Sequence, residues 1–445
     1  MSKRLKQLNW NLDGRTEILL KQLTAYIFHA LGFDIDFNLQ QIKYGPFLSS
    51  KFNKAEAYQE LPPPFVKDQN ILVFNKILSS LSYTKLYKAK YNNGDGDDVD
   101  DDTSVFNDDI ERFIPLRSHS SFEKYGNNID IGKVLFASLK NIYVDTVLLR
   151  FLIVNKYNLD KALTSYIDSL NWKSKKFNVD KILNGGDEII FRKDRSCKMI
   201  DLLKLGYIYF RGVDKSDRVV FRIEVRRHFR SNCSDKDLER IVILLIETGI
   251  LFLKESKKAT KATMLFDMTG FTLANADLHI VKFLAYQFNN NYPEFLGMII
   301  IHNAPKIFYA IWKIIKGWLD PILVEKVRFT YDAELKELID DKYIPIELGG
   351  EDNYKANYIE PSKKSSLKPI DNRFKKLYHQ RCTLTLQFIE STIRWIKAES
   401  QHESYNYLIQ RLKLQQALCK NYIDLDPYIR TRGVYDRSDE LNLSF

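Results

Sequence analysis

The sequence has few cysteines and histidines, and neither residue forms a recognisable cluster. The four cysteines lie far apart and form no C-x-x-C pair, which argues against a zinc site and a disulfide scaffold: Cys197, Cys233, Cys382 and Cys419. The seven histidines are scattered and include no H-E-x-x-H motif. No nucleophile elbow, P-loop or dinucleotide fingerprint is present either. We therefore expect no metal, no other cofactor and no enzymatic activity.

Long apolar runs are also absent. No stretch approaches the roughly 18 uncharged apolar residues of a membrane-spanning helix. The first residues, MSKRLKQLNWNLDGR, lack the apolar centre of a secretory signal. We expect a cytoplasmic protein that associates peripherally with endosomal, endoplasmic-reticulum or lipid-droplet membranes.

The charge is unevenly distributed along the chain. The net charge is +10, but residues 94–111 carry eight aspartates and one glutamate without lysine or arginine, so the remainder carries +19. A basic body suits an anionic membrane surface, whereas an ordinary solvated Lys/Arg surface explains the same count. Nucleic-acid binding is not expected, because the aromatic residues sit in apolar runs rather than among basic residues.

The most informative segment is Phe266–Thr330, where charge is scarce. Three strand candidates, Met264–Met268, Met298–His302 and Val327–Thr330, alternate with helices that are apolar on more than one face. Upstream, residues 199–230 are typical of a helix and two strands, and Asp235–Phe252 of a helix capped by Asp235. These patterns predict an α/β fold with a mixed, mostly parallel sheet, whose helices form a hydrophobic pocket.

Eleven side chains are candidates for the lining of this pocket, although each of them alone would fit an ordinary hydrophobic core equally well. The candidates are Phe266, Met268, Phe271, Thr272, Phe283, Phe288, Ile300, Phe308, Ile311, Trp312 and Ile315. Moving a two-chain lipid through water would expose roughly 30 methylenes at ~0.8 kcal/mol each, so a dry pocket would be needed. The number of these candidate side chains, rather than any single one of them, indicates a pocket for a lipid.

Six segments in register resemble the CRAL-TRIO lipid-transfer family. They are LLRFLIVNKYNLDKAL (148–163), FRGVDKSDR (210–218), LFDMTGF (265–271), NYPEFLGMIIIHNAP (291–305), WLDPILVEKVRF (318–329) and YIPIELGGED (343–352). The tail DLDPYIRTRGVYD (424–436) is similar to a non-classical fungal branch of phosphatidylinositol transfer proteins. With that tail, the resemblance covers about two-thirds of the chain.

The resemblance implies a division of the chain into four parts. Residues 1–125 would form a partly helical extension with a disordered acidic loop near 93–111, and 126–195 the helical bundle that precedes the pocket. Residues 196–352 would form the lipid-binding domain, and 353–445 C-terminal helices and a tail that pack on the core. The family's mobile gate would correspond to Tyr331–Ile339, with Leu335, Leu338 and Ile339 facing inward, although the same pattern fits an ordinary surface helix.

The resemblance also implies a site for an inositol headgroup. In the family, a glutamate in the Tyr-Pro-Glu turn and a lysine after the Asp-Pro turn serve this role, and they match Glu294 and Lys326. Lys173 stands where the family has an arginine, and Leu323 where it has a threonine. A plain ion pair between Glu294 and Lys326 is the alternative. Ala274 stands where choline-binding members carry a hydroxyl, which makes phosphatidylcholine doubtful and leaves squalene or a sterol open.

The hypothesis from sequence is thus a monomeric, non-enzymatic protein that binds one phospholipid, with phosphatidylinositol favoured. It would exchange this lipid at transiently contacted anionic membranes, support phosphoinositide metabolism and lipid homeostasis, and present the lipid to a lipid kinase. The alternative is a scaffold that senses a lipid, squalene or a sterol without transferring it, and acts through a protein partner.

Overall fold

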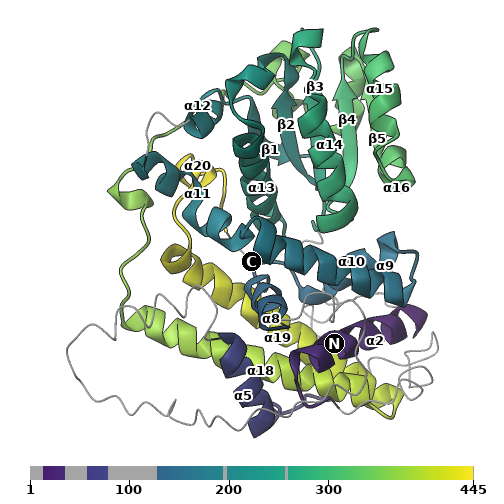
Figure 1. Cartoon of the computed structure of the whole chain (residues 1–445), viewed down its shortest axis with the longest axis vertical. Helices are drawn as coiled ribbons and strands as arrows, with labels where there is room; N and C mark the ends of the chain where they lie inside the picture. The colour runs from purple at the N-terminus through teal and green to yellow at the C-terminus, as the bar shows by residue number, and fades with distance from the viewer. Residues whose placement is uncertain (1–13, 36–57, 79–127, 194–197, 256–258, 444–445) are drawn as a thin grey trace. The chain divides into compact units, whose positions relative to one another are not determined.

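The computed structural model describes residues 14–35, 58–78, 128–193, 198–255 and 259–443. These residues form two compact units, each built from distant parts of the chain (Figure 1). The first unit comprises Met1–Leu139, Asn155–Ser174 and Ile370–Asn421, and the second Lys140–Val154, Lys175–Pro369 and Tyr422–Phe445. The units cross the boundaries expected from sequence, and the acidic segment near 93–111 lies outside the described residues.

The first unit is helical. Its N-terminal part contributes α2 (Gly14–Leu31), α5 (Asp68–Leu78) and α8 (Asn128–Ala137), and its later parts α10 (Leu159–Asn171), α18 (Asn372–Lys397) and most of α19 (Gln401–Ile429). Phe136 lies edge-on to Phe33 and Phe74, with ring centroids 6.1 and 5.6 Å away. Helices are present in both the N-terminal and the C-terminal parts of the chain, and α2 and α5 belong to the same unit as α18 and α19.

A polar contact joins the N-terminal and C-terminal parts of this unit. Glu17 is fully buried on α2, and its Oε1 accepts hydrogen bonds from Ser404 Oγ at 2.7 Å and Trp395 Nε1 at 3.2 Å. Lys21, one turn further, donates to Ser404 Oγ at 2.7 Å. Buried polar groups need such partners, so these contacts fix how α2 lies against α18 and α19.

The second unit contains a five-stranded sheet in the order β1-β2-β3-β4-β5. The strands are β1 (Ile208–Val213), β2 (Val219–Glu224), β3 (Ala262–Asp267), β4 (Leu296–His302) and β5 (Val327–Thr330). β1 and β2 form an antiparallel hairpin, and the other neighbours are parallel. The mixed, mostly parallel sheet predicted from sequence is confirmed.

The connections between the parallel strands are helical. They are α13 (Asp235–Phe252), α14 (Leu278–Tyr286), and α15 (Phe308–Lys316) with α16 (Pro321–Glu325). Since right-handed crossovers between sequential parallel strands place their helices on one face, α13, α14 and α15 lie side by side over the same face (Figure 1). The predicted bounds of α13 are confirmed, but its N-cap is Ser234, whose Oγ accepts from Asp237 N at 3.2 Å, rather than Asp235.

The opposite face of the sheet is covered by the segment that follows β5. Leu335, in the one-turn helix α17 (Leu335–Leu338), and Ile339 are buried against Leu265 and Ile300 of the central strands. The backbone of this segment is tied to the β1–β2 turn, because Lys215 N donates to Leu338 O at 2.9 Å. These contacts fill one face of the sheet with side chains.

The C-terminal tail is held by buried ion pairs within the second unit. Arg430, with 3% of its side chain exposed, lies 2.8 Å from Asp426 and 2.6 Å from Asp436. Burial alone would raise the pKa of Asp426, but Arg430 and Arg432 lower it below its ordinary value. Arg437 extends the network to Asp187 of α11 (Val179–Lys193) at 2.5 Å. The tail is therefore an integral part of this unit.

The described residues contain neither a candidate membrane span nor a candidate metal cluster. None of their helices is long and apolar enough to cross a membrane. In the same part of the chain, no group of three or more histidine, cysteine, aspartate or glutamate side chains could hold a metal ion.

We predict that the tail network contributes strongly to stability. Asp426→Ala should lower the free energy of unfolding by about 3–5 kcal/mol, because it leaves buried Arg430 with one carboxylate fewer. Glu360→Ala is the matched control: it removes an exposed pair with Lys204 and should cost less than about 1 kcal/mol. Urea unfolding followed by circular dichroism measures both; equal losses would contradict the assignment of a stabilising tail.

Candidate functional site

A cavity lies between the sheet and the helices α13, α14 and α15, with a volume of about 180 Å³. Its floor consists of two rows of apolar side chains in register across the strands. The first row is Phe221, Met264, Ile299 and Val327. The second row is Ile223, Phe266 and Ile301. Because successive strand residues point to opposite faces, these positions all face the helices.

The roof of the cavity follows the helical period. α13 contributes Leu238, Val242, Leu245 and Ile246, and α15 contributes Phe308, Ile311, Trp312 and Ile315. Positions three, four and seven residues apart share one helix face, so each helix presents an apolar stripe to the strands. The T-shaped contact of Phe271 and Phe308, with ring centroids 5.7 Å apart, joins the loop after β3 to α15.

Eight of the eleven side chains predicted to line a pocket do line this cavity: Phe266, Met268, Phe271, Phe288, Phe308, Ile311, Trp312 and Ile315. The other three predictions are wrong. Ile300 points to the opposite face of the sheet and packs on Leu335. Thr272 is exposed, and its hydroxyl donates to Asn275 Oδ1 at 2.9 Å. Phe283 contacts Phe177 instead, with ring centroids 6.0 Å apart.

The gate predicted at Tyr331–Ile339 is also wrong. Leu335 and Ile339 are buried in one hydrophobic cluster with Val220, Leu265 and Ile300. Leu338 is partly buried and packs against this cluster. Those strand residues alternate with the cavity-lining ones, so α17 lies on the face away from the cavity. The cavity is covered instead by α15, which lies between β4 and β5 along the chain.

The structure brings Glu294 and Lys326 together and adds a second lysine. Glu294 Oε1 is 2.5 Å from Lys326 Nζ, and Oε2 is 2.5 Å from Lys261 Nζ. The three residues come just before β4, β5 and β3, respectively, so they meet at the edge where the parallel strands begin. Leu296 and Val327, the first residues of β4 and β5, line the cavity. Lys261 was missed, because no motif marks it.

The electrostatics of this cluster favour an anion. Glu294 is buried, which alone would raise its pKa, but hydrogen bonds from Lys261 and Lys326 lower it below the ordinary value. Buried Arg150 also lies within electrostatic reach of Glu294, and its guanidinium donates to the carbonyl oxygen of Thr260. The two lysines exceed Glu294 by one charge, so the cluster can attract a phosphate while the carboxylate accepts hydrogen bonds from hydroxyl groups.

The backbone around Glu294 is held by buried contacts. Glu294 has φ +54°, in the left-handed region that non-glycine residues rarely adopt. Two residues earlier, the Tyr292 hydroxyl donates to Glu247 Oε1 of α13 at 2.9 Å, and Glu247 also lies 3.4 Å from buried Lys140. These contacts position the Tyr-Pro-Glu turn that carries Glu294.

Lys173, the third predicted headgroup residue, belongs to the first unit and is half-buried in the short π-helix Trp172–Lys176 that follows α10. Its role in a headgroup site stays a prediction.

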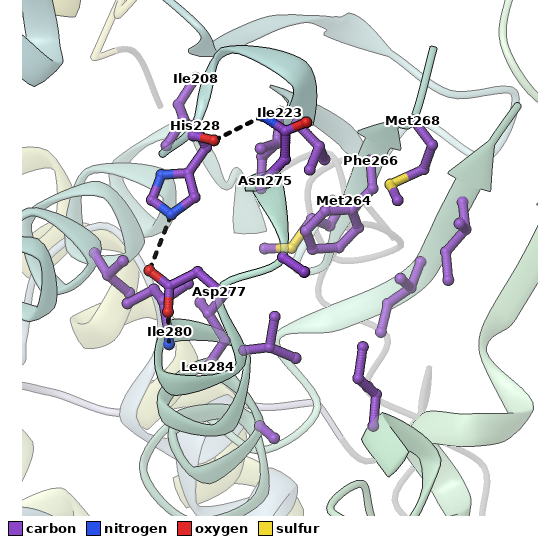
Figure 2. A pocket seen from close by; sticks show the side chains of 18 of the residues that line it. Ile208, Ile223, His228, Met264, Phe266, Met268, Asn275, Asp277, Ile280 and Leu284 are labelled. Carbon is purple, nitrogen blue, oxygen red and sulfur yellow. Dashed lines mark hydrogen bonds and ion pairs between the residues drawn. The ribbon is translucent and has the colours of Figure 1, made fainter. Parts of the chain in front are cut away.

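The lining of the cavity is almost entirely apolar, but one part of it, here called the polar wall, carries His228 and Asp277. The His228 ring and the Asp277 carboxylate lie side by side near the start of α14, with Met264 and Phe266 across the cavity from them (Figure 2). His228 Nε2 is 3.0 Å from Asp277 Oδ2. Sequence reasoning missed this pair, because its members lie 49 residues apart and form no motif.

The chain is similar in sequence to several known proteins. Residues 203–350 match the model of the CRAL/TRIO domain. The chain is 36% identical over 316 residues to "Phosphatidylinositol transfer protein CSR1" of Eremothecium gossypii, covering 70% of this chain and 72% of that protein. It is 31% identical over 438 residues to "CRAL-TRIO domain-containing protein C3H8.02" of Schizosaccharomyces pombe, covering 96% and 90%. A solved structure, "Crystal structure of Sfh5", matches 53% of this chain and 89% of its own at 17% identity, with a TM-score of 0.40.

The similarity to the two fungal relatives extends well beyond residues 203–350. For the relative from Schizosaccharomyces pombe, it covers nearly the whole chain. The chain therefore belongs to the CRAL-TRIO family, in its fungal branch similar to phosphatidylinositol transfer proteins.

Proposed function

We propose that the protein binds one phospholipid, with phosphatidylinositol favoured, and exchanges it between membranes. The observation that carries this proposal is the apolar cavity beside a cluster of two lysines and Glu294. The cavity would take acyl chains, which cost ~0.8 kcal/mol per methylene to expose to water. The printed name of the relative from Eremothecium gossypii supports the same class of ligand.

In this proposal the polar headgroup lies at the edge where β3, β4 and β5 begin. Lys261 and Lys326 would bind the phosphate, and Glu294 would accept hydrogen bonds from inositol hydroxyls. A choline headgroup offers no hydroxyl to Glu294, which favours the inositol lipid. Lys173 is retained as a further candidate on the basis of the sequence.

Release and uptake require part of the roof to move, and α15 is the helix we propose for this role. Its inner residues Ile311 and Trp312 line the cavity but are only half-buried. Its outer face leaves Ile314 50% exposed, and Ile307 before the helix is 47% exposed. A weakly anchored amphipathic helix can swing out at lower cost than the better-buried α13.

The outer face of α15 also suits an anionic bilayer. Lys306, Lys313 and Lys316 are exposed around Ile307 and Ile314. Basic residues close to an anionic membrane contribute about 1 kcal/mol each, and apolar side chains insert at the headgroup boundary. The proposed transfer cycle therefore begins when α15 contacts the membrane.

The headgroup assignment predicts a selective loss of phosphatidylinositol. Lys326→Ala should weaken phosphatidylinositol binding by about 10- to 150-fold, because a charge-assisted hydrogen bond contributes about 1.5–3 kcal/mol. Lys336→Ala is the matched control, since that lysine pairs with Asp341 outside the cluster. Transfer of labelled phosphatidylinositol between vesicles is the measurement, with labelled squalene binding as a check on the cavity. A lipid sensor would bind phosphatidylinositol without transferring it. Equal losses of phosphatidylinositol and squalene binding in Lys326→Ala would contradict a headgroup role.

The lowered pKa of Glu294 predicts how binding depends on pH. The carboxylate stays ionised above its ordinary value of 4.5, so its contribution to folding and to binding is fully present there. That contribution is lost as pH falls through the lowered pKa of the folded state. Phosphatidylinositol binding relative to the Glu294→Gln variant should therefore stay constant from pH 8 to pH 5. A ratio that changes within this range would contradict the ion cluster.

The membrane-contact role predicts an effect of α15 on vesicle binding. Ile314→Asp should reduce co-sedimentation with phosphatidylserine-containing vesicles about fivefold or more, because it removes an inserting apolar side chain and adds a negative charge. Ile346→Asp is the control: Ile346 is 59% exposed and precedes Leu348, which packs on the sheet face away from the cavity. Equal effects of both substitutions would exclude α15 as the specific contact.

A further inference from the structure

The polar wall of the cavity differs in chemistry from the lysine cluster. Tyr207, His228 and Asp277 all line the cavity, and each is buried. Asp277 follows β3, whereas Lys261 precedes it, so the two sites lie at opposite ends of a six-residue strand. At about 3.3 Å per residue, the strand between them is roughly 20 Å long.

The hydrogen bonds of this wall define which groups donate. A carboxylate accepts only, so His228 donates from Nε2 to Asp277 Oδ2 at 3.0 Å. The other ring nitrogen of His228, Nδ1, lies 3.3 Å from the Tyr207 hydroxyl. Asp277 Oδ1 accepts from Ile280 N at 3.3 Å and so caps α14.

The neighbouring amide has a structural role. Asn275 Nδ2 donates to the backbone oxygen of His228 at 3.0 Å (Figure 2). It also donates to the backbone oxygen of Arg226 at 3.0 Å. Its Oδ1 accepts from the backbone and hydroxyl of Thr272. Asn275 therefore holds the wall in place, and its hydrogen-bonding groups are used within the protein.

What this wall offers a ligand is acceptor capacity. A carboxylate can accept about four hydrogen bonds, and two are described for Asp277. Its side chain is 2% exposed and faces an apolar cavity, where an added negative charge would be strongly repelled. A ligand hydroxyl there can donate to Asp277, whereas an ether cannot, and a carboxylate is disfavoured.

We propose that Asp277, held by His228 and Tyr207, binds the hydroxyl of a neutral lipid alcohol within the cavity. The ligand class is a long-chain or cyclic alcohol, and the site is separate from the phosphate-binding cluster. The inference rests on the proposed function only in requiring that the cavity holds a lipid.

A competition experiment on the full chain tests this assignment. Radiolabelled 1-octadecanol is displaced at pH 7 by unlabelled 1-octadecanol, its methyl ether or octadecanoic acid. The three competitors share the same chain and differ at the polar end. We expect the alcohol to compete about tenfold better than the ether, as one hydrogen bond to a charged group allows, and the acid to compete worst. Equal competition by alcohol and ether in the unmodified protein would overturn the proposal.

A substitution of Asp277 tests whether this side chain causes the preference for the alcohol over the ether. Asp277→Asn keeps an N-cap residue but removes the charge, so the preference for alcohol over ether should fall to about twofold or less. Asp371→Asn, at the N-cap of α18 in the helical unit, should leave the preference unchanged. An unchanged preference in Asp277→Asn would also overturn the proposal.

Phosphatidylinositol transfer by the same preparations separates the two hypotheses. If transfer persists while octadecanol shows no preference over its ether, the alcohol site alone is refuted. If neither labelled lipid binds, the lipid function of the cavity is refuted together with it.

Discussion

The alternation of side chains along β2, β3 and β4 is the constraint on which the second unit depends. One set, which includes Met264, Phe266 and Ile299, faces the helices and forms the cavity floor. The intervening set, which includes Leu265 and Ile300, faces α17 and is filled by Leu335 and Ile339. A shift of one residue in strand register would exchange these sets and place the filled face under α15. The cavity exists because only one face of the sheet is closed by side chains that fill it.

The parallel arrangement of the strands also separates two kinds of polar chemistry. All the strands from β2 to β5 begin at one edge, where Lys261, Glu294 and Lys326 meet. Asp277 follows the opposite end of β3. An apolar cavity thus lies between a cation-rich edge and the buried carboxylate of Asp277. A ligand with one charged or hydroxylated end can be oriented by whichever end of the strands matches its chemistry.

Sequence patterns located the elements better than the contacts between them. The bounds of α13 followed from its apolar period, but the choice between Ser234 and Asp235 as N-cap depends on backbone geometry at a single residue. Ile300 was misplaced because a strand buried on both faces reads as a continuous apolar run, here MIII in β4, with no alternation to indicate its faces. The segment 331–339 misled for a similar reason: an amphipathic pattern shows that a helix has an apolar side, but not which surface that side covers.

Residues close together in the chain were sufficient to predict the succession of strands and helices, the apolar character of the segment from Phe266 to Thr330, and the motifs typical of the family. The folded chain was needed to show that Lys261 joins Glu294 and Lys326, that His228 pairs with Asp277, and that α2 lies in one unit with α18 and α19. Such contacts join residues tens to hundreds of positions apart. Local periodicity cannot specify them, since they are set by how complete strands and helices pack and by the need of each buried charge for a partner.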